Sequence, residues 1–319
     1  MASNNNNQDS SKGRFECVVR YNRHIRDVFY RIGLEFFGDG ARAFAATRAG
    51  QFAQLDLSSA ALPEADTIPK DLADAAQRKI LLRRPFSFTD VTVSGDKTRA
   101  EILYCVVGPG SLRMTSLSPG DTISVIGPLG NGFWMPEGKR TALLVGGGMG
   151  IGPLEHLAKV LKAEHCEIEV LVFAGAKSAD KLPFEVRSDE ISQEPGMWLA
   201  EFAEHGVESL VATDDGSAGW HGSVIDCLSQ WLGKSDSAGA DTIIYACGPE
   251  AMLARMAEVA AESDVDCQVS MERRMACGIG LCQSCAIECR TEVEGETVYK
   301  MCCKDGPVFD SRDVVFNLG

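Results

Sequence analysis

The sequence has no uninterrupted apolar run that approaches the 18 residues expected of a membrane-spanning helix. Basic residues are outnumbered, with 31 Lys and Arg against 45 Asp and Glu, so the formal net charge is −14. Because nucleic-acid binding needs a basic surface, this balance argues against it. The first 13 residues are polar and contain no apolar segment of a secretory signal, so we expect a disordered leader and a cytoplasmic protein.

Histidine is also scarce, and none of the five lies near the cysteines that crowd the C-terminal part. A zinc site would more often include histidine or two matched C-x2-C pairs, and a disulfide framework would need an oxidising compartment. Cys277, Cys282 and Cys285 have the spacing C-x4-C-x2-C, and Cys302 and Cys303 follow later. This triplet with a distant fourth cysteine is typical of a plant-type [2Fe–2S] site.

The length of 319 residues predicts two or three domains. Residues 14 to about 135 contain short runs rich in β-branched and aromatic residues, separated by turn residues, which predict an antiparallel β-barrel. Leu62–Lys79 breaks the pattern and is expected to be an inserted loop with a short helix. The predicted strands are FECVVRYNRHI, VFYRIGLEF, QFAQLDL, PFSFTDVTV, AEILYCVV and DTISVIGPLG.

One segment of this half, Arg84-Pro85-Phe86-Ser87, combines side chains that suit a nucleotide-like cofactor. A guanidinium can bind a pyrophosphate, an aromatic ring can lie on a flat ring system, and a hydroxyl can meet a polar edge. The alternative is a plain strand that carries a surface arginine.

Two glycine-containing turns follow in the same half. Gly110-Ser111 precedes a short predicted helix, and such a helix start can bind an anion or can be an ordinary turn. Gly127–Gly132 ends the barrel and favours a structural turn that could also line a cofactor site.

A different pattern starts at residue 141, where TALLV predicts a buried parallel strand. Gly146, Gly147, Gly148 and Gly150 come next, followed by an amphipathic helix. Strand, glycine loop and helix is the arrangement of a nucleotide-phosphate site, although these glycines depart from G-x-G-x-x-G.

The alternation of strands and helices then continues. IEVLVFAGA, VESLVATDDGS, DTIIYACGP and VDCQVSM are predicted strands, and LPFEVRSDEISQ, VIDCLSQWLGK and EAMLARMAEVAAES are predicted helices. Cys247-Gly248 and the TDDGS segment should lie at the carboxyl edge of the sheet, where ligands bind, unless they are ordinary loops.

These motifs together resemble a known family. Arg84-Pro85-Phe86-Ser87 resembles the flavin motif R-x-[YF]-[ST] of ferredoxin reductase-type proteins, and Gly110-Ser111 is similar to their pyrophosphate turn. The loop at residues 146–153 and the turn at residues 247–249 are similar to their nicotinamide-nucleotide motifs. The cysteine loop and the segment CKDGPVF at residues 303–309 resemble the electron-transfer subunits of NAD-dependent dihydroorotate dehydrogenases.

The resemblance implies FAD on the barrel, a [2Fe–2S] cluster in the C-terminal lobe and NAD as electron acceptor. A separate FMN-containing catalytic subunit would oxidise dihydroorotate for pyrimidine (UMP) synthesis, in a heterotetramer with two copies of each subunit. Electrons would pass from FMN through the cluster and FAD to NAD⁺, with no acid–base residue on this chain. The implied cluster ligands are Cys277, Cys282, Cys285 and Cys303, and Cys302 is the alternative fourth ligand.

The implied domains are a FAD-binding β-barrel at residues 14–137, an NAD-binding α/β domain at 138–265 and a cluster lobe at 266–319. Small subunits of NADH-dependent ferredoxin:NADP oxidoreductases and of sulfide dehydrogenases share this layout, but their first cluster ligand resembles Asp, where this chain has Cys277. A nucleotide-binding redox sensor without turnover is another alternative. An oxygenase reductase would need a ferredoxin domain longer than residues 267–319.

Overall fold

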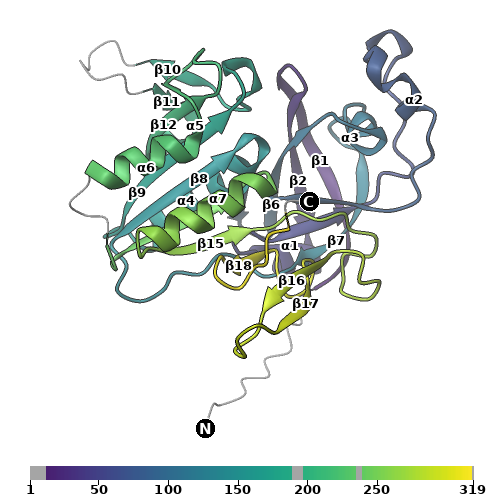
Figure 1. The fold of residues 1–319 in the computed structure, drawn as a ribbon. Coiled ribbons are helices and arrows are strands. Elements are labelled where there is room, and N and C mark those ends of the chain that lie inside the picture. Colours follow the sequence, from purple (N-terminus) through teal and green to yellow (C-terminus); the bar gives the residue numbers. More distant parts are fainter. Residues whose placement is uncertain (1–11, 189–196, 235–238, 318–319) are drawn as a thin grey trace.

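Two seven-stranded sheets form most of the protein, as the computed structural model shows for residues 12–188, 197–234 and 239–317 (Figure 1). The predicted leader, residues 1–13, lies outside the described residues except for Lys12 and Gly13, and Gly13 is the first residue of a strand. Within the described ranges, no helix is long and apolar enough to cross a membrane.

The first sheet is antiparallel and curls into a half-barrel, which confirms the predicted barrel-like fold of this half. Its strand order is β4-β3-β7-β1-β2-β6-β5. The strands are β1 (Gly13–Arg26), β2 (Phe29–Phe37), β3 (Phe52–Leu55), β4 (Arg84–Ser87), β5 (Asp90–Ser94), β6 (Lys97–Cys105) and β7 (Thr122–Leu129).

One predicted strand of this half, residues 85–93, is divided in the structure. Its two parts are β4 and β5, which lie at opposite edges of the sheet. Phe88 and Thr89 connect them and are almost fully buried. The chain therefore crosses from one edge to the other at this point, and the curl of the sheet brings the two edges near each other.

Short helices cover the half-barrel. The helix α1 (Gly38–Ala45), which the sequence did not predict, packs Phe44 against Phe36 inside the curl. The insertion between β3 and β4 is a loop with short helical turns, as predicted: η1 (Ala65–Thr67), η2 (Lys70–Leu72) and α2 (Ala73–Ala76). The helix α3 (Pro109–Met114) follows β6.

The second sheet has the order β13-β12-β9-β8-β14-β15-β18 and is parallel except for its last strand. The strands are β8 (Thr141–Gly147), β9 (Glu169–Ala176), β12 (Glu208–Thr213), β13 (Trp220–His221), β14 (Thr242–Cys247), β15 (Asp266–Ser270) and β18 (Val308–Asp310).

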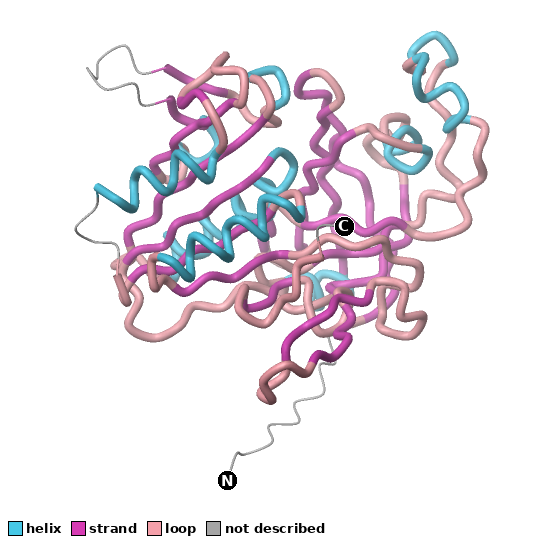
Figure 2. Tube along the Cα trace, in the orientation of Figure 1, coloured by secondary structure: helices cyan, strands magenta, loops and turns pink. Residues whose placement is uncertain are grey.

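Helices cover both faces of this sheet (Figure 2). Ala142 and Leu144 of β8 pack with α4 (Ile151–Glu164), after the turn η3 (Gly148–Gly150). Leu143 and Val145 join the core of α6 (Val224–Lys234) and α7 (Glu250–Glu262). Because alternate residues of a strand face opposite sides, an apolar run such as TALLV fits only a strand that is covered on both faces.

The predicted helix at residues 182–193 is wrong for the part that the structure describes. After the turn η4 (Ala179–Lys181), Val186–Ser188 form β10, which pairs with β11 (Met197–Leu199) ahead of α5 (Ala200–Ala203). Residues 189–193 lie outside the described residues. Pairing with a later strand decides the conformation here, which a local pattern does not show.

The C-terminal lobe contains the cysteine loop and a small hairpin of β16 (Ala286–Arg290) and β17 (Thr297–Met301). The chain then returns to the parallel sheet as β18, which pairs antiparallel with β15. The lobe thus shares its apolar core with the α6 and α7 face of the sheet.

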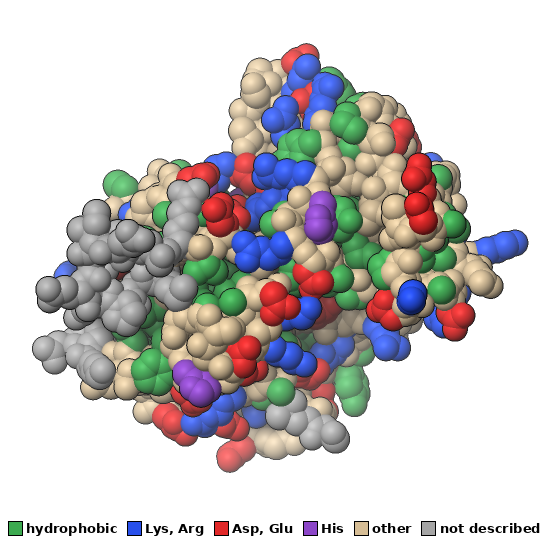
Figure 3. Space-filling view, turned by 90° about the horizontal axis from the view of Figure 1, so that it is seen from above, with side chains coloured by type: hydrophobic (Ala, Val, Ile, Leu, Met, Phe, Trp, Pro, Cys, Tyr) green, Lys and Arg blue, Asp and Glu red, His purple; other side chains and the backbone are tan. Residues whose placement is uncertain are grey.

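Barrel and parallel sheet also meet through a buried ionic network around Arg31. Arg31 of β2 is 3% exposed, and its guanidinium lies 2.8 Å from a carboxylate oxygen of Glu155 in α4 and 2.5 Å from one of Glu101 in β6. Glu201 is 3.9 Å away. Figure 3 shows basic and acidic side chains gathered side by side on the face seen from above.

Arg31 faces three carboxylates, of which Glu101 also has Arg23 at 3.8 Å, so negative charge is in excess, and this imbalance affects stability. Burial, with a smaller contribution from Glu101 and Glu201, raises the pKa of Glu155 to about 7 despite the opposing effect of Arg31. The folded protein therefore binds this proton more tightly than the unfolded chain, so ionisation of Glu155 opposes folding as the pH rises from about 4.5 to about 7.

We predict that Glu155→Gln removes this pH dependence. Relative to the variant, the wild type should lose up to about 3 kcal/mol of unfolding free energy between pH 4.5 and 7.5. Urea unfolding at several pH values measures the difference. Glu258→Gln, which changes an exposed ion pair with Arg255, is the control and should show no such trend. A constant difference between wild type and Glu155→Gln would contradict the assignment.

Candidate functional site

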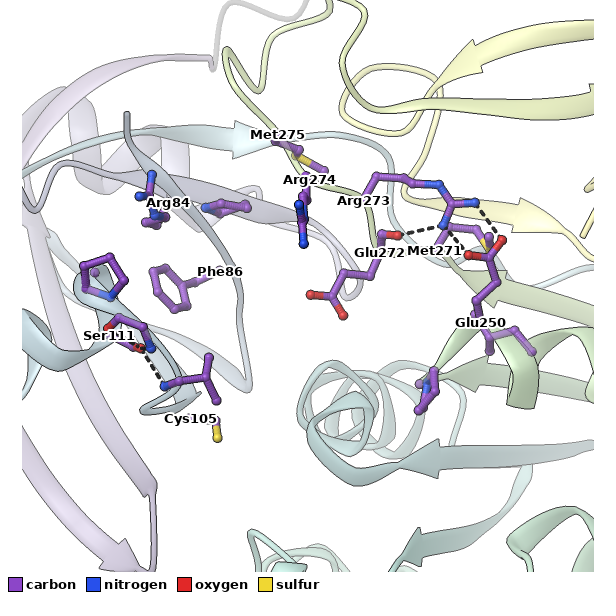
Figure 4. A pocket seen from close by; sticks show the side chains of 18 residues that line it. Arg84, Phe86, Cys105, Ser111, Glu250, Met271, Glu272, Arg273, Arg274 and Met275 are labelled. Carbon is purple, nitrogen blue, oxygen red and sulfur yellow. Dashed lines mark hydrogen bonds and ion pairs between the residues drawn. The ribbon is translucent and has the colours of Figure 1, made fainter. Parts of the chain in front are cut away.

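A cavity of about 650 Å³ lies where the half-barrel, the parallel sheet and the start of the cysteine loop meet (Figure 4). This volume is within the range of small-molecule and cofactor sites. Its lining contains residues from all three parts of the chain: Arg84, Pro85, Phe86, Cys105, Val107, Gly108, Pro109, Gly110, Ser111, Gly248, Pro249, Glu250, Leu253, Met271, Glu272, Arg273, Arg274 and Met275.

The barrel side of the cavity brings together most of the predicted flavin motif. The Arg84 guanidinium donates to the carbonyl oxygen of Leu82 at 2.8 Å, and no described carboxylate forms an ion pair with it. Gly110 packs against this side chain, since a Cβ there would lie 3.0 Å from Cγ of Arg84. Ser87 is outside the lining and pairs with Phe52 of β3.

The Ser111 hydroxyl has a role within its own turn. It accepts hydrogen bonds from the backbone N–H groups of Val107 and Gly108 at 3.0 and 3.2 Å. The side chain therefore fixes the turn that precedes α3, and this turn forms one wall of the cavity.

On the sheet side, Gly248 lines the cavity and the glycine loop packs directly behind it. A Cβ at Gly150 would lie 2.1 Å from the carbonyl oxygen of Cys247, and one at Gly147 would lie 2.6 Å from the sulfur of Met252. A side chain at either position would separate the two turns. Gly148, in contrast, has open space around its Cβ position and a φ of +55°.

Gly146 and Cys247 also belong to the interior of this edge rather than to the cavity wall. A Cβ at Gly146 would lie 2.6 Å from a methyl carbon of Ile151. Burial raises the pKa of the Cys247 thiol to about 12, so this thiol stays protonated and unreactive at neutral pH. The TDDGS segment forms a closed turn in which Asp215 accepts hydrogen bonds from Ser217.

Residues 271–275 line the opposite wall and lead into the cysteine loop. Arg273 forms a two-pronged ion pair with Glu250 at 2.7 and 2.9 Å, which fixes this segment to the start of α7. Figure 4 shows the Glu272 side chain reaching into the cavity from this wall, with Arg274 beside it. The sequence analysis missed Arg274, whose position in a cavity wall depends on the fold and not on a motif.

The cysteine loop brings its four predicted ligands together as two pairs. The side chains of Cys277 and Cys282 lie close enough to interact, and so do those of Cys285 and Cys303. Among the described residues, no three His, Cys, Asp or Glu side chains are arranged to hold a single metal ion. A [2Fe–2S] cluster, with two thiolates at each iron, matches a paired arrangement.

Backbone amides surround these sulfur atoms. The N–H groups of Ile279 and Cys282 point to the Cys277 sulfur at 3.5 and 3.4 Å, and that of Gly280 points to the Cys303 sulfur at 3.1 Å. Gly278 and Gly280 have positive φ values of 71° and 85°, which lets the loop turn its amides inward. Hydrogen bonds to sulfur stabilise the charge of bound thiolates.

The two adjacent cysteines point in different directions. The Cys302 thiol donates to the carbonyl oxygen of Met271 at 3.2 Å within the apolar core, whereas Cys303 accepts from the loop amide of Gly280. The exposed Cys282 differs again, because hydrogen bonds from Ser284 and Cys277 lower its pKa to about 6. This thiol is therefore largely ionised at neutral pH, as a metal ligand must be.

Asn131 is a further residue that the sequence analysis did not single out. It lies in the predicted Gly127–Gly132 turn, and its side chain donates to the carbonyl oxygens of Asp305 and Val308 at 2.9 and 3.1 Å. It also accepts from the Val308 N–H at 3.0 Å. The turn is therefore structural, and it holds the segment that follows Cys303.

Comparison with known proteins decides the family. Residues 272–315 match the iron–sulfur cluster binding domain of dihydroorotate dehydrogenase B, and residues 144–258 match the oxidoreductase NAD-binding domain. The chain is 37% identical over 303 residues to the electron transfer subunit of dihydroorotate dehydrogenase B (NAD(+)) from Caldanaerobacter subterraneus subsp. tengcongensis, covering 95% of this chain and 99% of the relative.

This chain belongs to the family of dihydroorotate dehydrogenase B electron transfer subunits. A second member of the family, from Bacillus caldolyticus, is 39% identical over 245 residues, which cover 76% of this chain and 83% of the relative. Membership confirms the predicted resemblance and makes the chain an oxidoreductase subunit that transfers electrons and acts with a catalytic subunit.

A solved structure shares the fold of this electron transfer subunit. A chain of the NADH-dependent reduced ferredoxin-NADP oxidoreductase superposes with a TM-score of 0.68 at 26% identity, covering 94% of this chain and 90% of that one. The half-barrel, the parallel sheet and the cluster lobe therefore form one established arrangement, as predicted.

We predict that Asn131→Ala loosens the cluster lobe from the half-barrel. The loss of three hydrogen bonds, two of them partly buried and one exposed, should lower the unfolding free energy by about 1–3 kcal/mol and shorten the time for which the purified chain retains iron. Thermal unfolding and iron release to a chelator measure the two effects. Asn317→Ala, which removes one exposed hydrogen bond to Glu288, is the control. Equal behaviour of the two variants would refute this role.

Proposed function

We propose that this chain passes electrons from an FMN-containing dihydroorotate dehydrogenase catalytic subunit to NAD⁺, with a [2Fe–2S] cluster and FAD as its carriers. The observation that carries the proposal is the shared cavity. There, part of the predicted flavin motif, the Gly248 turn and the segment that leads into the cysteine loop lie within one space of about 650 Å³. Electron transfer between carriers requires that their sites be close, and a cavity shared by the flavin motif and the segment that leads into the cysteine loop supports this arrangement.

FAD would lie against the barrel wall of the cavity. Arg84 is a cation without a carboxylate partner among the described residues, so it is available to bind a pyrophosphate. Phe86 is half-buried and can lie on a flat ring. Pro85, Gly110 and Ser111 complete this wall. Ser87 does not line the cavity, so its proposed contact with the flavin ring would require the Ser87 side chain to reach past the residues that do.

The nicotinamide nucleotide would bind at the carboxyl edge of β8 and β14. Gly148 has the free space to meet a phosphate, whereas Gly146, Gly147 and Gly150 allow the loop to pack against the turn of Cys247 and Gly248. The proposed role of Gly146, Gly147, Gly150 and Cys247 is therefore to shape the edge, and that of Gly148 and Gly248 is to contact the ligand.

Cys277, Cys282, Cys285 and Cys303 would hold the cluster. When bound, the cluster supplies one-electron steps and the flavin supplies the hydride for NAD⁺. The paired thiols, the inward amides and the acidic thiol of Cys282 fit this group. The proposed division is then a FAD-binding barrel (14–137), an NAD-binding domain (138–265) and a cluster lobe (266–319).

The cluster edge is also the proposed contact with the catalytic subunit. Leu281 is 78% exposed and Ile279 is 46% exposed. These two residues flank Gly280 in the cysteine loop, and Leu281 directly precedes the exposed Cys282. Apolar side chains in such a position favour burial by a partner. Two copies of each subunit, a cytoplasmic location and a role in pyrimidine synthesis complete the proposal.

A second candidate is the small subunit of an NADH-dependent ferredoxin:NADP oxidoreductase, which the fold similarity favours. Two observations weigh against it. The named relatives are 37% and 39% identical to this chain, compared with 26% for that structure. This chain also has Cys277 at the position of the first cluster ligand, which in those small subunits resembles an Asp.

We predict that Cys303→Ala removes the cluster whereas Cys302→Ala retains it. Cys303 faces the loop amides, and Cys302 is bonded to Met271 inside the core, so the matched pair separates ligand from packing. Iron content and the EPR signal of the reduced protein provide the measurement. Retention of a normal cluster in Cys303→Ala together with its loss in Cys302→Ala would reverse the assignment.

The function itself is tested by turnover. The purified chain should oxidise NADH with an artificial acceptor and should not oxidise dihydroorotate. Addition of an FMN-containing dihydroorotate dehydrogenase subunit should create dihydroorotate-dependent reduction of NAD⁺. Binding of NADH without any turnover would favour a redox sensor, and activity only with ferredoxin and NADP would favour the second candidate.

A further inference from the structure

The buried amide of Gln54 has an unusual position. Gln54 lies in β3, is fully buried, and neither its amide oxygen nor its amide nitrogen has a hydrogen-bond partner within the described residues. Two other glutamines of the described part, Gln51 and Gln268, are almost as buried, and both have partners. Gln51 bonds to Arg48 and Gly130, and Gln268 bonds twice to Trp134. A buried amide without a partner is costly, which makes Gln54 a candidate for contact with a bound group.

The amide points to the cysteine loop. A Cβ at Gly278 would lie 2.3 Å from Nε2 of Gln54 and 2.8 Å from its Cδ, so the side chain lies flat against this glycine. Gly278 directly follows Cys277, the first thiol of the loop. Phe52, on the same face of β3, joins the core that contains Cys285 and Cys303. The face of β3 that carries Gln54 is therefore turned to the cluster lobe and away from the barrel interior.

The strand that carries Gln54 also lies beside the flavin motif. Gln54 is the register partner of Pro85 in β4, which lines the cavity together with Arg84 and Phe86. The residue thus stands between the wall that would hold FAD and the loop that would hold the cluster. The bound flavin and the bound cluster are therefore the two possible acceptors of a hydrogen bond from Gln54. The contact with Gly278 favours the cluster.

We propose that the side-chain amide of Gln54 donates a hydrogen bond to the sulfur of the bound cluster or of its Cys277 thiolate and thereby raises the reduction potential of the cluster. The proposal rests on the proposed cluster site. The cluster gains negative charge on reduction, and an N–H donor stabilises that charge more in the reduced state than in the oxidised state. The loop amides of Ile279 and Cys282 act on the same thiol from within the loop, and Gln54 would act from the barrel side.

The test is a redox titration of purified Gln54→Leu, which keeps the volume of the side chain and removes the donor. The oxidised-to-reduced ratio of the cluster at a fixed potential should rise about tenfold, which is a shift of about 59 mV to more negative potential for one electron. The flavin midpoint should stay unchanged. Gln54→Glu, which replaces the donor by an acidic group, should shift the cluster further in the same direction. EPR of the reduced cluster reports the potential independently of turnover.

A second measurement uses the iron-free chain. There Gln54→Leu should unfold at the same or a higher temperature than the wild type, because it replaces an unpartnered buried amide by an apolar group. Gln268→Leu, which breaks satisfied hydrogen bonds, should unfold at a lower temperature and leave the cluster potential unchanged. An unchanged cluster potential in Gln54→Leu, or a shift of the flavin alone, would overturn the inference. A wild-type chain that takes up no cluster would instead refute the proposed function.

Discussion

The position of the cysteine loop against the half-barrel is the constraint on which the rest of the structure depends. Asn131 holds residues 305–308 through three hydrogen bonds, and β18, which starts at Val308, pairs with the edge of the parallel sheet. The segment that follows Cys303 is therefore fixed to both sheets at once. Because Cys302 and Cys303 directly precede it, this attachment decides which of the two thiols faces the loop.

The second junction, around Arg31, uses the opposite chemistry. The segment that follows Cys303 is held by the neutral hydrogen bonds of Asn131, whereas the barrel meets α4 through one buried guanidinium and three carboxylates. The pKa of Glu155 is raised by its burial, so the strength of this contact depends on pH.

Much of this organisation is predictable from the sequence because it depends on patterns of residues that are close together in the chain. The run TALLV predicts β8 and the spacing of the cysteines predicts their loop, while Arg84, Pro85 and Phe86 of the predicted flavin motif line the cavity. The errors have non-local causes. Residues 85–93 divide because the sheet curls, and residues 186–188 form a strand because they meet β11. Asn131 and Gln54 were missed because each acts on a segment far along the chain, 174 residues away in the case of Asp305.

The central claim is that one chain places its flavin and cluster close enough to exchange electrons. Anaerobic mixing of the purified chain with NADH, followed by absorbance and rapid-freeze EPR, tests it most directly. We expect loss of flavin absorbance first and then a reduced [2Fe–2S] signal in the same molecules within a single mixing experiment. Reduction of the flavin with a cluster that stays oxidised, although dithionite can reduce it and its potential lies above that of the flavin, would contradict the account.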